Sequence, residues 1–228
     1  VGCRGPLRGG IKEADAGGTV GCALGQLGIA GMTRHGAASD WTVMHISIEG
    51  EVSFSPADNL MGLSNFECAA KLHEQFGKKV SLGICGPVGE YLGLLSGISF
   101  SDTDLRPSRL AARGGVGAVM GAKKVKAIVL DLNKMPKLHD RKKVIGAVKQ
   151  YNAFLKEDEI AQNMKTFGTA LMADTQNYLG GLPVRNFTAG QLVDPDQETM
   201  RMGGEFIREQ NLERGGETAH ACMPGCTI

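Results

Sequence analysis

The stretch that most constrains the fold is residues 113–128, which read Arg-Gly-Gly-Val-Gly-Ala-Val-Met-Gly-Ala-Lys-Lys-Val-Lys-Ala-Ile. Its three leading glycines permit a tight turn and a close approach of the main chain to another group. The apolar residues that follow predict a short helix at 115–122 and a strand at 125–131. Amides at the start of that helix would point positive dipoles at an anion, and Arg113 would bind phosphate through two hydrogen bonds. The stretch therefore predicts an anion-binding turn.

A second interpretation of this turn needs no ligand, because glycines also allow a turn to pack tightly against a sheet. The common nucleotide signatures do not fit. The dinucleotide pattern that begins at Gly115 requires a third glycine where this chain has Met120, and no Gly-Lys-Ser/Thr of a phosphate loop is present. If the ligand is phosphorylated, we do not expect an ordinary nucleotide.

Composition sets further bounds. A chain of 228 residues forms one large or two small domains, and its 33 glycines favour an architecture rich in turns over a helical bundle. The net charge of +1 predicts no nucleic-acid binding. The absence of a run of eighteen apolar residues predicts no membrane span. Since no initiator Met is present, we expect the sequence to begin inside a longer protein.

Four of the six cysteines are widely spaced among small or apolar residues, namely Cys3, Cys22, Cys68 and Cys85. This spacing predicts a reduced, cytoplasmic chain. We expect most of the four to be buried as small hydrophobic side chains.

The first half of the chain predicts a mixed sheet. Frequent glycines in the first forty residues suit short strands, and residues 41–48 turn back into 52–54 as a hairpin. A helix is predicted to open at Ser55-Pro56 and to close at Gly77, followed by a strand at 79–85. The side of that helix expected to face the core carries Leu60, Leu63, Ala70 and Phe76.

From residue 136 the composition shifts to charged helix-forming residues, so we place a domain boundary near 135. Helices are predicted at 160–175 and 197–210. The first helix of this part carries one apolar stripe, formed by Val144, Val148, Tyr151 and Leu155. A mixed sheet followed by helices indicates the α+β class, with domains at 1–135 and 136–228.

Cys222 and Cys226 flank Met-Pro-Gly, which predicts a loop in which two thiolates can converge on one metal or cluster. Two other interpretations remain open. The pair are ordinary cysteines, or they bind zinc together with His220.

Four motifs together resemble the amino-terminal part of the tungsten-containing aldehyde ferredoxin oxidoreductases, and they follow the family's order. They are residues 113–128, Gly86-Pro-Val-Gly-Glu90, Gly181-Leu-Pro-Val-Arg-Asn-Phe187 and Cys222-Met-Pro-Gly-Cys226. The resemblance implies a tungsten or molybdenum ion held by two pterin dithiolenes, whose phosphates share a magnesium ion. It also implies a mixed-sheet pterin-binding domain followed by the start of a mainly helical domain.

The resemblance implies the site residues as well. Arg113 would contact the pterin phosphates, the carbonyl of Gly114 would reach the magnesium, and Gly115 and Gly117 would allow close approach. Asp15, which stands where the family has Asn, would bind magnesium as a hard oxygen ligand beside Gly17 and Gly18. Lys123, Lys124 and Lys126 would either extend the positive field or lie in solvent at a strand entrance.

Cys222 and Cys226 match the first two ligands of the family's [4Fe–4S] cluster, although their gap is three residues where two is commoner, and the third and fourth ligands are missing. We therefore expect a fragment, inactive alone, of an enzyme that oxidises small aldehydes and passes electrons to ferredoxin or another iron–sulfur carrier. No catalytic side chain is assigned, and a homo-oligomer remains open. The alternative is a non-enzymatic phosphate-binding or redox-sensing module with a zinc or disulfide site.

Overall fold

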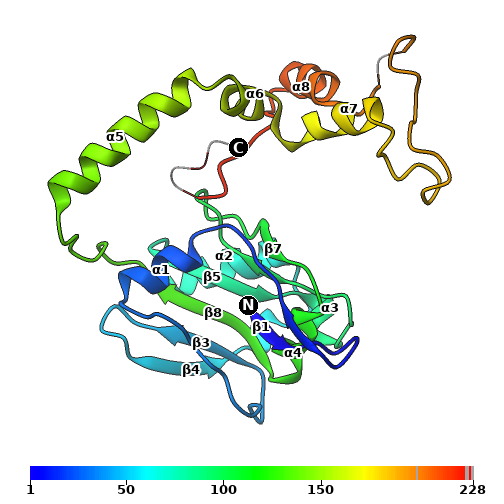
Figure 1. Cartoon of the computed structure of the whole chain (residues 1–228). Helices are drawn as coiled ribbons and strands as arrows, with labels where there is room; N and C mark the ends of the chain where they lie inside the picture. The colour runs from blue at the N-terminus through cyan, green and yellow to red at the C-terminus, as the bar shows by residue number, and fades with distance from the viewer. Residues whose placement is uncertain (199, 224–225, 227–228) are drawn as a thin grey trace. The chain divides into compact units, whose positions relative to one another are not determined.

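A computed structural model describes residues 1–198, 200–223 and 226 of the chain. The chain divides into two compact units, Val1–Lys137 and Leu138–Ile228, which we call unit 1 and unit 2. Unit 1 carries every named strand of the described residues, and unit 2 is mainly helical (Figure 1). The chain is therefore α+β. Among the described residues, no helix is long and apolar enough to cross a membrane.

A six-stranded mixed sheet forms the centre of unit 1, in the order β4-β3-β8-β5-β6-β7 (Figure 1). Its strands are β3 (Thr42–Ile46), β4 (Val52–Pro56), β5 (Val80–Cys85), β6 (Ile98–Phe100), β7 (Arg109–Ala111) and β8 (Val125–Asp131). β8 is parallel to β3 and antiparallel to β5. A separate antiparallel hairpin pairs β1 (Gly2–Arg4) with β2 (Ile11–Glu13).

Helices cover both faces of this sheet, so its central strands are buried on both sides. One core cluster packs α2 (Asn65–Phe76) against Val43, Leu82 and Val129. Two further clusters contain residues of α1 (Val20–Gln26) and α4 (Val116–Ala122) together with residues of the sheet. All six residues of β5 are buried. Burial on both faces also explains why β8 carries an apolar run at 127–130 rather than strict alternation.

The hairpin of β3 and β4, the strand β5 and the strand β8 lie where the sequence predicts them, but the second helix begins later than predicted. Ser55-Pro56 ends β4, and a short 3₁₀ turn, η1 (Asp58–Leu60), separates it from α2. The true start is a capping box at Ser64 and Glu67, in which each side chain bonds the other's backbone amide. Leu60 belongs to the core, and Leu63 and Phe76 pack against it, as predicted. Ala70 is exposed instead, and the buried residues of α2 are Cys68, Ala69 and Leu72.

Unit 2 contains α5 (Arg141–Glu157), α6 (Glu159–Phe167), η2 (Gly168–Ala170), α7 (Leu171–Tyr178) and α8 (Gly204–Glu213). The helix predicted at 160–175 is therefore interrupted, because Gly168 takes a φ of 65° that ends α6. The apolar stripe predicted on α5 exists, but the described residues leave it largely uncovered. Val144, Val148 and Tyr151 are 41%, 51% and 62% exposed.

Candidate functional site

The turn predicted to bind an anion connects β7 to α4. Gly114 and Gly115 both have left-handed backbone angles, with φ of 74° and 73°. Residues with a side chain rarely adopt this conformation, so the glycines are required for the turn itself. Arg113 lies immediately before them and is exposed. Its guanidinium is therefore accessible to a ligand in solution.

The same glycines pack closely against other parts of unit 1, as the ligand-free interpretation requires. A Cβ atom on Gly115 would lie 2.4 Å from the carbonyl oxygen of Leu94, and one on Gly117 would lie 2.4 Å from that of Gly97. The amide of Gly117 donates to the carbonyl oxygen of Ser96 at 3.0 Å. The prediction that amides at this helix start are available to an anion is therefore wrong for Gly117.

The β1–β2 hairpin connects the turn to the second predicted site segment. A Cβ atom on Gly114 would lie 2.0 Å from Cγ of Lys12 in β2, so the turn packs directly against that strand. β2 ends at Glu13, and the buried Ala14 leads from it to the exposed Asp15. The turn at 113–115 and the segment that begins at Asp15 are far apart in the sequence, but both adjoin the β1–β2 hairpin.

Asp15 and Gly17 line a cavity of about 780 Å³ in unit 1, a volume typical of small-molecule sites. Its apolar floor includes Met44, Ile128 and Leu130 of the sheet. Of the described residues, 113–115 and Gly117 are not part of the cavity lining. The structure therefore brings the two predicted segments to the same hairpin without placing them in one cavity.

The backbone conformation and the close packing at position 18 require a glycine. It has a φ of 106°, and a Cβ atom there would lie 2.4 Å from the carbonyl oxygen of Ser101. The next amide, that of Thr19, donates to the same oxygen at 2.9 Å. The segment that carries Asp15 is thus fastened to the connection between β6 and β7.

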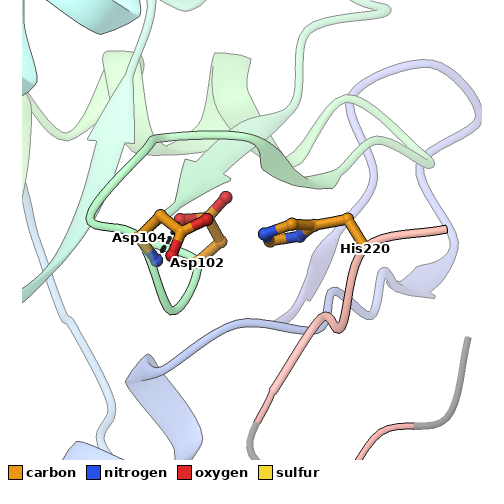
Figure 2. A group of neighbouring side chains, drawn as sticks. All are labelled: Asp102, Asp104 and His220. Atoms are coloured by element: carbon orange, nitrogen blue, oxygen red, sulfur yellow. Dashed lines mark hydrogen bonds between the residues drawn. The ribbon is translucent and has the colours of Figure 1, made fainter. Parts of the chain in front are cut away.

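That connection is organised by Asp102, which the sequence analysis did not single out. Its completely buried carboxylate accepts from the amides of Asp104 and Arg106 at 2.8 and 2.9 Å, from Nε of Arg106 at 2.9 Å and from Ser108 Oγ at 2.8 Å. Figure 2 shows Asp102 with the bond from Asp104. Burial alone would raise the pKa of Asp102, but the bonds from Ser108, Arg106 and Asp104 together lower it to about 2. The polar run 101–108 is the signal in the sequence that marks such a turn.

The ammonium groups of the three lysines after the turn all donate hydrogen bonds to main-chain carbonyl oxygens. Nζ of Lys123 donates to the carbonyl oxygen of Gly36 at 3.1 Å, and Lys124 donates to that of Ser39. Both lysines therefore hold the connection between α1 and β3. Lys126 is completely buried, so neither a solvated position nor a role in the field around an exposed anion describes it.

Two of the four scattered cysteines are buried in unit 1, Cys68 and Cys85. Burial raises the pKa of both thiols, that of Cys85 to about 12, although the nearby charge of Lys126 opposes the shift. Cys3 and Cys22 are only partly buried.

We expect Cys68 and Cys85 of the folded protein to resist alkylation by iodoacetamide near pH 8, because only the thiolate reacts. Mass spectrometry of the peptides measures the modified fraction, and the same reaction in denaturant provides the control. Alkylation of Cys85 in the folded state at the rate seen in denaturant would contradict the buried position.

The two cysteines predicted to bind a metal belong to unit 2. Cys222 and Cys226 are partly buried and lie outside helices and strands. The amide of Cys226 donates to the carbonyl oxygen of Met223 at 3.1 Å. Pro224 and Gly225, on which the predicted loop depends, lie outside the described residues.

Comparisons with known proteins match both parts of the chain. A family model described as "Aldehyde ferredoxin oxidoreductase, N-terminal domain" matches residues 1–132, and one described as "Aldehyde ferredoxin oxidoreductase, domains 2 & 3" matches residues 146–228. Tungsten-containing aldehyde ferredoxin oxidoreductases of Pyrococcus furiosus and Pyrococcus abyssi are each 31% identical over 223 residues. These matches cover 97% of this chain and 35% of each relative, so the chain spans about a third of their length.

A solved structure gives a likeness of fold. It is the active site complex BamBC of benzoyl coenzyme A reductase in complex with 1,5-dienoyl-CoA, with a TM-score of 0.63 and 22% sequence identity. The likeness covers 69% of this chain and 23% of that chain.

Proposed function

This chain belongs to the aldehyde ferredoxin oxidoreductase family, and we propose that it forms the cofactor-binding part of a cytoplasmic enzyme that oxidises small aldehydes to carboxylic acids and passes the electrons to ferredoxin. The cofactor would be a tungsten or molybdenum bis-pterin with an associated magnesium ion, held by Arg113, the carbonyl of Gly114 and Asp15. When bound, this cofactor and a [4Fe–4S] cluster supply the chemistry: an aldehyde and water become a carboxylic acid, two protons and two electrons.

The observation that carries this proposal is the exposed Arg113 on a turn that packs directly against β2, the strand leading to Asp15. The planar guanidinium of Arg113 binds phosphate oxygens in pairs. The left-handed Gly114 and Gly115 turn the backbone sharply there, so that the carbonyl oxygen of Gly114 becomes a candidate ligand for the magnesium ion.

Asp15 fits magnesium by its chemistry. Its carboxylate is exposed and is a hard oxygen ligand of the kind that magnesium prefers. The family's Asn is neutral, so Asp15 adds a negative charge beside the phosphates, which the bound cation offsets. Gly17 and Gly18 follow it, and Gly18 packs on Ser101 so closely that this segment is held in place before any ligand arrives.

Cys222 and Cys226 would supply two of the thiolates for the [4Fe–4S] cluster, which takes four. Of the remaining cysteines, Cys68 and Cys85 are buried in unit 1 and have a raised pKa, so they do not suit metal binding at neutral pH. Cys222 and Cys226 thus leave two of the four cluster ligands unassigned, and we propose that this chain alone is inactive.

Metal analysis tests the proposal. We expect protein purified anaerobically from cells supplied with tungstate to contain tungsten, measured by inductively coupled plasma mass spectrometry. Arg113→Ala should lower the tungsten content about tenfold, and Arg113→Lys by less, because lysine keeps the charge but not the paired geometry. Arg141→Ala, an exposed arginine of α5, is the matched control and should leave the content unchanged.

Two results would count against this proposal. Zinc in place of tungsten and molybdenum would favour a binding module. Unchanged tungsten content in Arg113→Ala would remove Arg113 from the cofactor site.

A further inference from the structure

Lys126 is the largest completely buried side chain in unit 1, and it is charged. Its ammonium group forms an ion pair with the carboxylate of Glu90 and donates to the carbonyl oxygen of Cys85 at 2.8 Å. The other carboxylate oxygen of Glu90 accepts from the amide of Gly62 at 2.9 Å. A buried ion pair costs so much desolvation that packing alone does not explain it, since apolar residues of similar volume would fill the space at lower cost.

The ion pair and the bond to Cys85 link three segments of unit 1. Lys126 belongs to β8, and Cys85 ends β5. Glu90 ends α3 (Pro87–Glu90), a single helical turn of four residues that is too short to be stable on its own. The ion pair therefore fixes where α3 lies relative to the central strands of the sheet.

α3 and α4 contact each other through their main chains, with no side chain between them. A Cβ atom on Gly121 would lie 2.0 Å from the carbonyl oxygen of Gly89, and a Cβ atom on Gly89 would lie 2.9 Å from that of Gly117. The two backbones are thus in direct contact, and no flexible side chain can absorb a displacement. A movement of α3 must move α4 as well.

The position of α4 determines that of the turn before it, residues 113–115. Gly117 is bonded to Ser96 and Gly115 packs on Leu94, both in the segment that follows α3. Arg113 lies two residues before Gly115. Through these contacts, the place of the Arg113 guanidinium depends on the place of α3.

We propose that Lys126 and Glu90 are positioning residues for the phosphate-binding turn: their ion pair fixes α3 to β8, and α3 sets the position of α4 and of Arg113. This inference rests on the proposed role of Arg113. Directional hydrogen bonds hold α3 at a defined distance from β8, which an apolar pair would not do, and a misplacement of about 1 Å is enough to weaken a bidentate contact greatly.

Binding of inorganic pyrophosphate to the 228-residue chain, measured by isothermal titration calorimetry, tests the inference. The double variant Lys126→Met/Glu90→Gln removes both charges together and leaves no unpaired buried charge. We expect its dissociation constant for pyrophosphate to rise about tenfold while its unfolding temperature stays close to that of the parent.

A double-mutant cycle separates positioning from stability. Arg113→Ala alone should also weaken binding, and adding the double variant to it should cause no further loss, because both changes act through the same guanidinium. The control His45→Leu removes the hydrogen bond between Nε2 of His45 and Oδ1 of Asp131, which lie 2.9 Å apart at the other end of β8, and should leave pyrophosphate binding unchanged.

The outcomes are distinguishable. If the folded double variant binds pyrophosphate as the parent does, the inference is overturned and the proposed function stands. If the parent and Arg113→Ala bind pyrophosphate equally well or not at all, the role of Arg113 fails, and the inference with it. If the double variant does not fold, Glu90→Asp decides: it keeps both charges but shortens the side chain, so binding about threefold weaker supports the inference and unchanged binding overturns it.

Discussion

Replacing Gly121 with alanine should destabilise unit 1 by about 4 kcal/mol or more, a large part of the roughly 5–15 kcal/mol that stabilises a typical native protein. The added methyl carbon would lie 2.0 Å from the carbonyl oxygen of Gly89 and 2.9 Å from its carbonyl carbon. Backbone atoms in direct contact cannot move aside as a flexible side chain can. The cost therefore greatly exceeds the gain of about 0.5–1 kcal/mol that alanine normally brings to a helix.

The chain has a single tryptophan, whose fluorescence can be used to measure the loss of stability. Trp41 packs against the core clusters on both faces of the sheet, so its fluorescence during urea unfolding reports on unit 1. Gly25→Ala is the matched control, because Gly25 also lies in a helix of unit 1 but a Cβ atom there would meet nothing within 4 Å. That variant should be as stable as the parent or slightly more stable. A Gly121→Ala protein with the parent's urea midpoint would show that α3 and α4 are not in backbone contact.

Asp102→Asn should cost about 3 kcal/mol of the folding free energy of unit 1 at neutral pH. A carboxylate can accept from all four donors that surround Asp102, whereas the amide group of asparagine must turn two of its own donors toward them. The urea midpoint followed by Trp41 fluorescence gives the loss. Asp104→Asn, at a carboxylate that is 59% exposed, is the control and should cost less than about 0.5 kcal/mol.

The effect of Asp102→Asn should depend on pH in a defined direction. The folded pKa of about 2 lies below the ordinary value of 3.8, so the carboxylate stabilises the fold at any pH above about 4 and this contribution disappears as the pH falls toward 2. The difference corresponds to about 2 kcal/mol. The stability gap between parent and variant should therefore shrink by about that amount between neutral and strongly acid pH. A constant gap would mean that Asp102 is protonated in the fold or has an ordinary pKa.

Local patterns in the sequence predict much of unit 1. The strand Val125–Asp131 and the helix before it follow from an apolar run bounded by glycines and lysines, and the β3–β4 hairpin follows from alternation around Gly50. The helix α1 does not, because Gly21 and Gly25 lower its intrinsic propensity and tertiary packing of Ala23 and its neighbours decides its structure.

Sequence patterns are less informative about the site, because they do not show which atoms come into contact. The glycines of residues 114–117 predict a sharp turn, but only the fold shows that Leu94, Gly97 and Lys12 are the groups they approach. Lys126 stands among charged neighbours that suggest solvent, and its partner Glu90 is 36 residues away. Contacts at such separations depend on sheet order, which is not encoded in any local pattern.

The position of β8 has a consequence for how unit 1 is made. β8 is the last strand of the sheet in sequence, yet it lies between β3 and β5, at the centre. Until residue 131 has been synthesised, the chain can form only two separate pieces, β3 with β4 and β5 with β6 and β7, each with an unpaired edge. Such edges attract other chains, and pairing across about 80 residues is slow. We therefore expect the nascent chain to depend on protection from aggregation until this strand inserts, and the sheet to assemble in one late step.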